Sequence, residues 1–600
     1  MYYVCGWIAG IILALTIISS LYMHAGRYRH SRLFKPLYAV FAGCVAAVFV
    51  LMLPVVDLFG ISADPGTWHA VTARIILALH GTMQIFTLDI GAHEILETIQ
   101  MALPGFSAYL LMMSVLIVVC PVLTLSFILS LLKNVSAYIR LFFSFGKKLY
   151  VFSELNESSV ALAKDIRKNH HKKAAIVFTD VFGNDDESSY ELIEQAKECG
   201  AICFKNDIVT INFRLHSKKT EMRLFMIGAD ETENADQALK ILEMHKESHN
   251  IWLYVFSTRI DGEILLNKAE KGNITVRRVN EVRSLINRNL YESGSGLFKN
   301  AKEMPDGTRK ISAVIVGLGK HGTEMLKALT WYCQMDGYLI EIDAFDLDEK
   351  AEDRFSALAP ELMSPDYNGV IIPGESEYTI RIHSGVDVMS KTFADAVSCL
   401  KDATYAFVSL GSDEQNIRTA VDMRMLFERM KIKPTIQAIV RNPEAKKALE
   451  GITNFRGQAY NIGFIGDTED SFSEEVIMNS GLEADALRRH RQWGDEEDFW
   501  QYEYNYNSSV ASAIHARARI AECIPGAGKK KEDMTDEEKD TIEKLEHRRW
   551  NAYMRAEGYI YSGSPEKSSR NDLAKMHHNL VDFSSLSEPD KRKDSSVGAN

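Results

Sequence analysis

Three long stretches near the N-terminus contain no charged side chain, and this feature limits what the chain can fold into more than any other. The stretches run over residues 2–23, 37–56 and 98–132, and the apolar part of the last one begins at Leu103. About 20 apolar residues in a helix cross the ~30 Å hydrocarbon core of a bilayer. We therefore predict an α-helical membrane anchor over residues 1–147, with spans over 2–23, 37–56 and 103–132.

The charges of the connecting segments predict the orientation of this anchor, because Lys and Arg of short loops stay on the cytoplasmic side. The basic residues lie between the first two stretches and after the third: Arg27, Arg29, Arg32, Lys35, Lys133, Arg140, Lys147 and Lys148. The segment between the second and third stretches carries acids and only Arg74 as a cation. We expect a multi-pass protein of the cell inner (plasma) membrane, with the N-terminus outside and the large C-terminal part cytoplasmic.

The apolar segment 70–88 lies inside the outward loop. Its apolar residues favour membrane insertion by roughly 4 kcal/mol, and Arg74 near the centre of a span opposes insertion by up to ~3 kcal/mol. Since a full span is marginal, we expect a half-inserted or interfacial helix here. The alternative is a helix that lines a pore, with Gln84, Asp89 and Glu94 as candidate lining residues. The sequence after this segment is not the carbonyl ladder of potassium filters.

From Lys148 the sequence changes to short β-rich runs that alternate with amphipathic helical stretches, which is typical of a doubly wound parallel sheet. We place a first Rossmann-like domain over residues 148–296. Its first strand-to-helix turn, Ser153 to Glu157, contains no glycine, whereas close approach of the backbone to a phosphate requires glycine there. We expect a structural or dimerising unit, with Asn156 as a helix N-cap.

A second Rossmann-like domain is predicted over residues 311–490. Its first strand is followed by a G-x-G-x-x-G sequence with Gly317, Gly319, Lys320, His321 and Gly322. The first glycine permits a tight turn, the second lets the backbone approach a phosphate, and the third lets helix pack on strand. This sequence predicts a nucleotide site, with a vestigial turn as the alternative.

Acids and polar residues at later strand ends extend this prediction. Asp346 or Asp348 follows the second strand, where an acid accepts hydrogen bonds from ribose hydroxyls. Gly411, Asp413 and Asn416 follow another strand and are expected beside the glycine turn, because ligands of open α/β sheets bind at the carboxyl ends of the strands. For Asp413, a helix N-cap is the alternative.

The two units, directly after a short membrane anchor, resemble the tandem RCK (TrkA-N type) regulatory domains of prokaryotic potassium channels and transporters. The resemblance covers roughly residues 148–440 by pattern, with specific matches at Gly317, Gly319, Gly322 and Asp346. In that family the glycine-rich turn binds a nucleotide, and binding is transmitted to the membrane. The resemblance implies NAD(H) or another nucleotide, including a cyclic one, as a regulatory ligand of a homo-oligomer (dimer or tetramer).

A small, mostly helical module is predicted over residues 535–595, after a connecting helical region over 491–525 and a charged linker. Thr535 and Glu538 have the spacing of a capping box, and Gly558 ends the helix. The sequence from Leu545 to Trp550, with later matches through Phe583, resembles the ryanodine-receptor (RyR) repeat domain. Aromatic and basic residues here are candidate contacts for a base and a phosphate: Arg548, Trp550, Tyr553 and Tyr559. The alternative is that Trp550 and Tyr559 are core aromatics.

Composition limits the classes of function. The net charge of −12 argues against duplex nucleic acid as a partner. The eight cysteines form no C-x-x-C pair, so no metal site is indicated. Prokaryotic chains that join TrkA-N units to a RyR repeat look like effectors of nucleotide-signalled antiviral defence. We expect a nucleotide-sensing, ligand-gated membrane effector or channel-like protein without catalytic residues. The alternatives are a non-conducting regulatory subunit of a potassium transport system and a membrane-bound NAD-dependent oxidoreductase.

Overall fold

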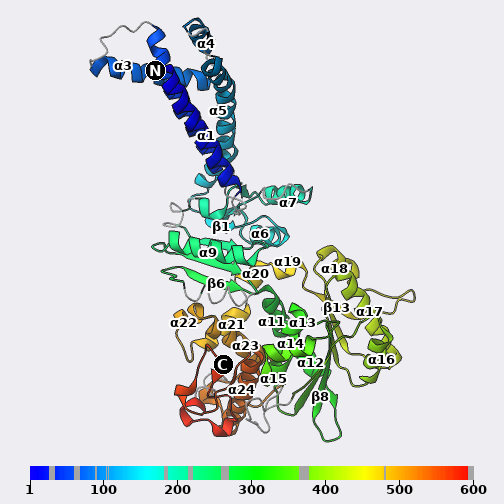
Figure 1. Ribbon diagram of the computed structural model, residues 1–600. Coiled ribbons are helices and arrows are strands. Elements are labelled where there is room, and N and C mark those ends of the chain that lie inside the picture. The colour runs from blue at the N-terminus through cyan, green and yellow to red at the C-terminus, as the bar shows by residue number, and fades with distance from the viewer. Residues whose placement is uncertain are drawn as a thin grey trace. The chain divides into compact units, whose positions relative to one another are not determined.

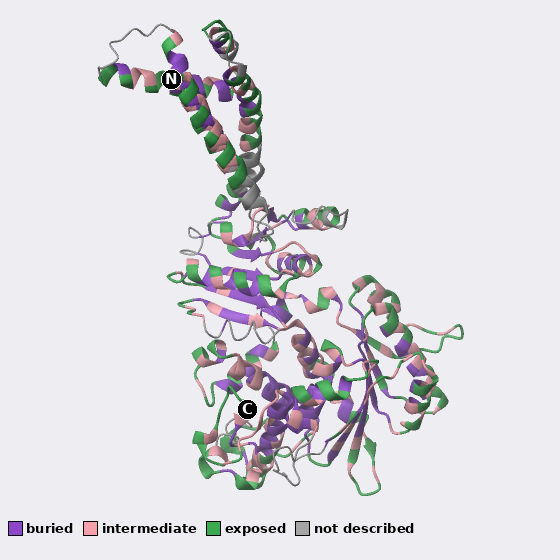
Figure 2. Cartoon of the chain, viewed as in Figure 1, coloured by how far each residue is buried: buried purple, intermediate pink, exposed green. Residues whose placement is uncertain are grey.

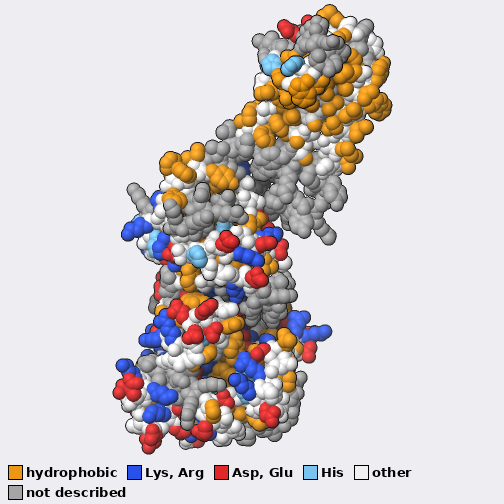
Figure 3. All heavy atoms as spheres, turned by 90° about the vertical axis from the view of Figure 1, so that its left-hand side faces the viewer, with side chains coloured by type: hydrophobic (Ala, Val, Ile, Leu, Met, Phe, Trp, Pro, Cys, Tyr) orange, Lys and Arg blue, Asp and Glu red, His pale blue; other side chains and the backbone are white. Residues whose placement is uncertain are grey.

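Four helices near the N-terminus are long and apolar enough to cross a membrane. The computed structural model describes residues 1–25, 34–59, 68–87, 91–102, 105, 107–181, 187–211, 213, 220–258, 266, 269–363, 378–478 and 481–591. The candidate spans are Tyr2–Ser19, Ala39–Leu58, Trp68–Thr87 and Ala108–Ile128. They belong to α1 (Tyr2–Ala25), α2 (Phe34–Val55), α3 (Trp68–Thr87) and α5 (Ser107–Phe142), and the shorter α4 (Gly91–Ala102) precedes α5. In Figure 3 hydrophobic side chains predominate on the described part of this region that faces the viewer.

Helix α3 covers the segment for which the sequence predicts a half-inserted or interfacial helix. It is a continuous helix of 20 residues with mean hydropathy 1.2, the lowest of the four candidates. The sequence argument treated Arg74 as an isolated charge, but its guanidinium lies 2.9 Å from the Asp57 carboxylate. Pairing reduces the cost of a charge near lipid. With four spans, both ends of the helical region would lie on the same side of the membrane. The prediction that the N-terminus lies outside therefore holds only for three spans.

The first sheet consists of six parallel strands in the order β3-β2-β1-β4-β5-β6. The strands are β1 (Lys148–Phe152), β2 (Ala174–Phe178), β3 (Ile202–Cys203), β4 (Met222–Met226), β5 (Ile251–Phe256) and β6 (Thr275–Val279). Helices α6 (Glu157–His170), α7 (Glu187–Glu198) and α9 (Glu231–Met244) connect them, and α11 (Glu281–Ser293) and α12 (Ser295–Lys299) follow. Most strand residues are buried (Figure 2), as expected for a parallel sheet with helices on its faces.

The second sheet repeats this order as β10-β9-β8-β11-β12-β13, with the short β7 (Lys302–Glu303) antiparallel to β8. The strands are β8 (Arg309–Val316), β9 (Tyr338–Phe345), β10 (Tyr378–His383), β11 (Tyr405–Val408), β12 (Thr435–Ile439) and β13 (Ile462–Ile465). The connecting helices are α13 (Lys320–Tyr332), α14 (Ala351–Leu358), α15 (Pro360–Met363), α16 (Lys391–Cys399), α17 (Asp413–Arg429) and α18 (Pro443–Leu449). Two Rossmann-like parallel sheets are therefore present, as predicted.

The second sheet has a hydrophobic core on each face. Ile311, Ala313 and Ile315 of β8 pack with α11 and α13, and Val314 and Val316 pack with α16 and α17. This alternation follows from the two-residue repeat of a strand. In Figure 1 helices α16, α17 and α18 lie on one side of the sheet and α11 and α13 on the other.

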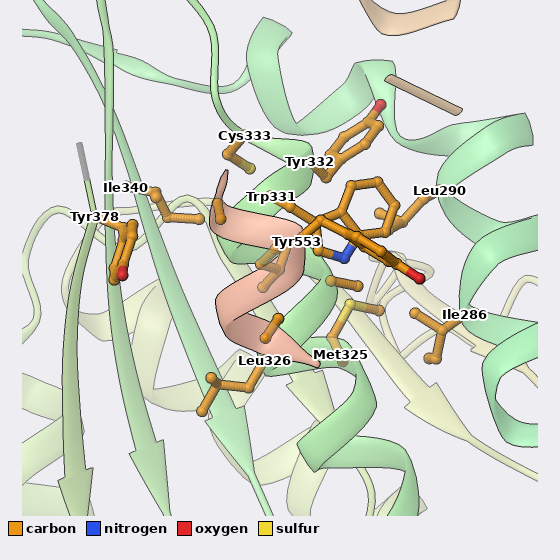
Figure 4. Close-up of a cluster of buried hydrophobic side chains, with 14 of the residues drawn as sticks. Ile286, Leu290, Met325, Leu326, Trp331, Tyr332, Cys333, Ile340, Tyr378 and Tyr553 are labelled. Atoms are coloured by element: carbon orange, nitrogen blue, oxygen red, sulfur yellow. The ribbon is translucent and has the colours of Figure 1, made fainter. Parts of the chain in front are cut away.

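The C-terminal helices share the first of these cores. After α19 (Thr468–Ser471), α20 (Glu474–Ile477), α21 (Gly481–His490) and α22 (Glu496–Gln501), the long helices α23 (Glu503–Ala521) and α24 (Asp536–Ala556) pack near α13, and the short strands β14 (Ile560–Tyr561) and β15 (Met576–His577) pair beyond them. Tyr553 of α24 lies beside Trp331 and Met325 (Figure 4). The capping box of Thr535 and Glu538 is confirmed, and Gly558 has φ +83° just after the helix.

Contacts between residues divide the chain into two compact units. One contains Met1–Lys147 and Ala175–His216, and the other contains Lys148–Ala174 and Ser217–Asn600. The glycine turn, the second sheet and the C-terminal helices all belong to the second unit.

Candidate functional site

The three glycines of the turn after β8 have different surroundings. Gly317 has φ +88°, and a Cβ on it would lie 2.5 Å from the Ser409 carbonyl oxygen. A Cβ on Gly322 would lie 1.8 Å from the Gly317 carbonyl oxygen, whereas a Cβ on Gly319 would meet nothing within 4 Å. Gly317 and Gly322 are therefore required by the packing of the turn. Gly319, the N-cap of α13, leaves open space in front of the helix.

This space belongs to a cleft of about 840 Å³ at the carboxyl ends of the strands of the second sheet. Eight of the ten residues predicted from the sequence line it: Gly317, Gly319, Lys320, His321, Asp346, Gly411, Asp413 and Asn416. The other two lie outside its lining. Gly322 is inside the turn, and Asp348 forms an ion pair with Arg354 at 2.5 Å. The volume is within the ~300–1,000 Å³ typical of small-molecule sites.

Asp346 joins the glycine turn to the end of β9. One carboxylate oxygen accepts a hydrogen bond from the Leu318 N–H at 2.6 Å, and the other accepts one from the Asp348 N–H at 2.7 Å. A carboxylate has about four lone-pair positions, so each oxygen keeps capacity for a ligand hydroxyl. The acid predicted at this strand end thus faces the cleft and also fixes the turn.

Asp413 is not the N-cap of α17. The cap is Ser412, whose hydroxyl oxygen accepts a hydrogen bond from the Gln415 N–H at 3.3 Å, because Ser412 and not Asp413 has the extended backbone of a cap. The Asp413 carboxylate accepts hydrogen bonds from the N–H groups of Arg441 and Asn442 at 3.0 Å. Asp413 therefore ties the start of α17 to the segment after β12.

Asn416 has a structural contact where a ligand contact was expected. It is only 1% exposed, its amide nitrogen donates to the Ile439 carbonyl at 2.9 Å, and its amide oxygen accepts from the Leu410 N–H. The side chain lines the cleft but its hydrogen-bonding groups are engaged by two strand ends. The sequence placed this residue correctly and could not show its partners.

The cleft has further lining residues that the sequence analysis did not single out, and four of them bear on ligand binding. Arg418 and Arg441 are exposed cations in its lining. Leu347 and Met389 are apolar residues of the lining that are 69% and 53% exposed. Arg441 lies two residues after the end of β12, so its position at a strand end was a signal for it. Met389 follows the last residues of an edge strand and has no such signal.

The two basic residues of the glycine turn, Lys320 and His321, differ in charge state and in their contacts. Burial and the neighbouring Arg441 and Lys320 lower the pKa of His321 to about 4, so His321 is neutral at pH 7. The Lys320 ammonium lies 2.9 Å from the Thr258 hydroxyl and 3.3 Å from the Glu231 carboxylate. Lys320 thus connects the cleft to residues of the first Rossmann-like domain.

Glu231 is held in place for this contact. Its carboxylate accepts hydrogen bonds from the Thr258 N–H and hydroxyl, both at 2.7 Å. Burial raises the pKa of Glu231, but the Thr258 hydrogen bonds and Lys320 outweigh burial and lower it below the ordinary value. Glu231 is therefore an ordered anion at the edge of the cleft.

In the first domain a side chain takes the place of an open turn. The Glu154 carboxylate accepts a hydrogen bond from the Ala229 N–H at 3.1 Å and lies 2.8 Å from where a Cβ on Gly228 would be. Asn156 caps α6, as predicted. The half-buried Glu154 side chain thus lies against the segment that precedes α9.

The candidate residues of the C-terminal module contact separate partners. Arg548 pairs with Asp336 at 2.9 Å, and the Tyr559 hydroxyl lies 3.5 Å from Asp572. Tyr553 is 6% exposed and packs edge-on against Trp331 (Figure 4). The half-buried Trp550 ring lies 4.9 Å from the His577 ring. A stacking role for Tyr553 does not fit its position, because the core covers its ring.

The candidate pore residues are only partly described. Gln84 lies on α3 and the exposed Glu94 on α4, while Asp89 lies outside the described residues. No group of three or more His, Cys, Asp or Glu residues in the described part of the chain is arranged to hold a metal ion.

Comparison with known proteins gives no family. No protein-family model and no curated protein sequence matches the chain. The crystal structure of one of the subunits of dipicolinate synthase from Bacillus halodurans is 9% identical with a TM-score of 0.19, over 56% of this chain and 93% of that one. A mutant O-GlcNAc transferase from Thermobaculum terrenum is 12% identical with a TM-score of 0.18, over 85% and 99%. At such TM-scores these similarities carry no argument.

Proposed function

We propose that the chain is a nucleotide-sensing membrane effector of the RCK/TrkA-N and RyR-repeat type, in which a nucleotide bound at the glycine turn changes the state of the membrane helices. The observation that carries this proposal is the cleft, because one cavity joins an open glycine turn, an acid at a strand end and exposed cations. We take NAD(H) or another dinucleotide or signalling nucleotide as the ligand class, and antiviral defence as the setting that the resemblance implies.

Each part of a nucleotide has a complementary region in the cleft. The exposed Leu347 and Met389 offer apolar surface for a base beside Asp346, which has acceptor capacity for ribose hydroxyls. The phosphates would lie in the space before Gly319, since N–H groups at a helix N-terminus and its dipole favour anions. Arg441 would lie within reach of the same anion.

Lys320 supplies a route from the ligand to the first domain. A phosphate at the turn competes with Glu231 and Thr258 for the Lys320 ammonium, which is 66% exposed. An exposed ion pair is worth only about 0–1 kcal/mol, so a phosphate can displace it. The first domain follows α5 directly in the sequence. A change at the Lys320 contact would therefore alter the domain that is attached to the membrane helix. Such coupling requires different affinities for the two states.

The test uses the full-length protein in liposomes. We expect ion flux or leak that depends on an added nucleotide and is absent in Gly319→Asp, whose carboxylate would occupy the phosphate position. Nucleotide binding by calorimetry without any flux would support the non-conducting regulatory subunit. Turnover of a nicotinamide cofactor without flux would support the oxidoreductase, and no binding of any dinucleotide or signalling nucleotide would contradict the proposal.

A further inference from the structure

The lining of the cleft follows five neighbouring strand ends of the second sheet. The strands β10, β9, β8, β11 and β12 are adjacent in that order, and the lining contains residues that follow each of them: Met389, Leu347, Gly319, Gly411 and Arg441. At ~4.8 Å between neighbouring strands, five strand ends extend over roughly 19 Å. The glycine turn after β8 is in the middle, so the cleft has one half beside β9 and β10 and another beside β11 and β12.

The half beside β9 and β10 suits the base and the ribose of a nucleotide. The residues that line it after these strands are apolar or acidic, with no cation in the described part of the chain: Asp346, Leu347, Val386, Asp387, Val388 and Met389. Apolar side chains can cover a base, and a carboxylate accepts hydrogen bonds from ribose hydroxyls. Two acids without a cation repel a phosphate, so a nucleotide in the cleft has its phosphates on the other side.

The half beside β11 and β12 contains the cations of the cleft. Lys320 of the turn, Arg418 of α17 and Arg441 line it, together with the acids Asp413 and Glu414. Arg418 and Arg441 are exposed, and their side chains form no ion pair or hydrogen bond with another residue that the structure describes. The Asp413 carboxylate is engaged by two backbone N–H groups. Two guanidinium groups are therefore available to an anion in this half.

The two arginines and the glycine turn can act on one chain of phosphates. Arg441 is close enough to His321 of the turn to contribute to the lowered pKa of that imidazole. A phosphate before Gly319 is one strand spacing from the end of β11 and two from the end of β12, or roughly 5 and 10 Å. A single phosphate at the turn stops short of this distance, whereas a chain of phosphates continues toward the arginines.

We propose that the cleft takes a nucleotide of the nucleoside triphosphate class, and that Arg418 and Arg441 bind the end of its phosphate chain. This inference rests on the proposed function and names the ligand class of that same site. A guanidinium donates two parallel hydrogen bonds to a phosphate. The nicotinamide half of NAD⁺ adds no phosphate beyond the turn. Among the described lining residues after β11 and β12, Leu410 is the one apolar side chain that could cover a second base.

Calorimetry on the full-length protein tests the ligand class. The probes are ATP with AMP and GTP with GMP, because apolar side chains do not distinguish one base from another, and NAD⁺ represents the dinucleotides. We expect at least one triphosphate to bind at least roughly tenfold more tightly than its own monophosphate and than NAD⁺, since hydrogen bonds between charged groups are the strong ones.

Arg418→Gln and Arg441→Gln each remove one guanidinium group from the cleft. We expect each to weaken triphosphate binding roughly tenfold or more and to reduce the ratio of triphosphate to monophosphate affinity. Arg429→Gln is the matched control, because Arg429 is an exposed residue of the same helix α17 and does not line the cleft. It should bind the probes like the unmodified protein. All three arginines are exposed, so the variants should fold.

The outcomes distinguish this inference from the proposed function. If NAD⁺ binds and neither triphosphate binds more tightly than its monophosphate, the triphosphate class is wrong and a nucleotide cleft remains. Equal losses in Arg429→Gln and Arg441→Gln would mean that net charge alone acts, and would also overturn the inference. If no nucleotide binds, the proposed function is wrong as well. The affinity ratio of the unmodified protein needs no variant, so it decides the matter even where a variant does not fold.

Discussion

The two Rossmann-like domains have the same strand order but differ at the one turn where a nucleotide would bind. In both, an N-cap starts the helix after the fourth strand of the order, namely Asp230 for α9 and Ser412 for α17. In both, the side chain of an asparagine in this helix joins two strand ends. Asn234 accepts a hydrogen bond from the Gly228 N–H and donates one to the Phe256 carbonyl. Asn416 accepts one from the Leu410 N–H and donates one to the Ile439 carbonyl. The domains therefore share a framework.

The acid at the first position of each helix is also shared. Glu231 accepts a hydrogen bond from the Thr258 N–H and Asp413 from the Arg441 N–H, each directly after the next strand. The first turn differs: in one domain it carries Glu154, whose carboxylate accepts a hydrogen bond from the Ala229 N–H, and in the other Gly319 leaves open space. The comparison teaches that the framework is independent of ligand binding, and that the capacity to bind resides in a few residues of one turn.

The largest expected effect is a loss of stability at a glycine that the fold requires, compared with the glycine that leaves space for a ligand. Gly322→Ala places a Cβ 1.8 Å from the Gly317 carbonyl oxygen, so we expect the second sheet to lose about 3 kcal/mol or more of local stability. Hydrogen exchange of β8 and β11 in the full-length protein measures this loss. Gly319→Ala is the control, because its Cβ meets nothing. Equal protection in both variants would contradict the assignment of roles.

The second effect concerns the open turn itself. Asn and Asp are both good helix N-caps, so Gly319→Asn and Gly319→Asp should leave α13 folded. We expect Gly319→Asp to weaken nucleotide binding roughly 100-fold or more, which corresponds to ~2.7 kcal/mol, and Gly319→Asn to weaken it less because it adds bulk without charge. Calorimetry on the full-length protein measures both. Unchanged affinity in Gly319→Asp would remove the ligand from this turn.

The third effect tests the shared framework. Asn234→Ala and Asn416→Ala each leave a partly buried N–H and a buried carbonyl without their partner, which costs about 1–3 kcal/mol. We expect similar losses of exchange protection at β4 in the first variant and β11 in the second. A large loss for Asn416 with none for Asn234 would mean that only one domain depends on this contact.

Local features were predictable from the sequence, because residues within four positions decide them. The caps by Asn156 and Thr535 are examples. The two parallel sheets were predictable for another reason, because strands that alternate with helices are typical of a doubly wound sheet. Contacts between distant residues were not predictable. The hydrogen bond from Asn416 to the Ile439 carbonyl joins two strand ends, and the ion pair of Arg74 with Asp57 joins two helical segments, so neither contact could be read from the sequence around one residue.

The site shows the same limit. Its glycine turn, Asp346 and Gly411 were placed correctly at one edge of one sheet, since parallel strands bring their carboxyl ends together. The contact of Lys320 with Glu231 joins residues 89 positions apart in different domains. No periodicity or motif reports such a pair, because it depends on how the end of one sheet is placed against another.

The smallest expected effect tests this contact between the domains. Glu231→Gln removes the charge that competes with a phosphate for Lys320, and an exposed pair is worth about 0.2–1 kcal/mol. We expect nucleotide affinity to rise roughly two- to fivefold, measured by calorimetry on the full-length protein. Asp236→Asn is the matched control, since Asp236 lies on the same helix and pairs with Lys240 at 3.6 Å on the surface. If Glu231→Gln binds no more tightly than Asp236→Asn, Lys320 does not change partners on binding, and the coupling must run through α13 instead, where Glu324 contacts Arg283 of α11 at 3.2 Å.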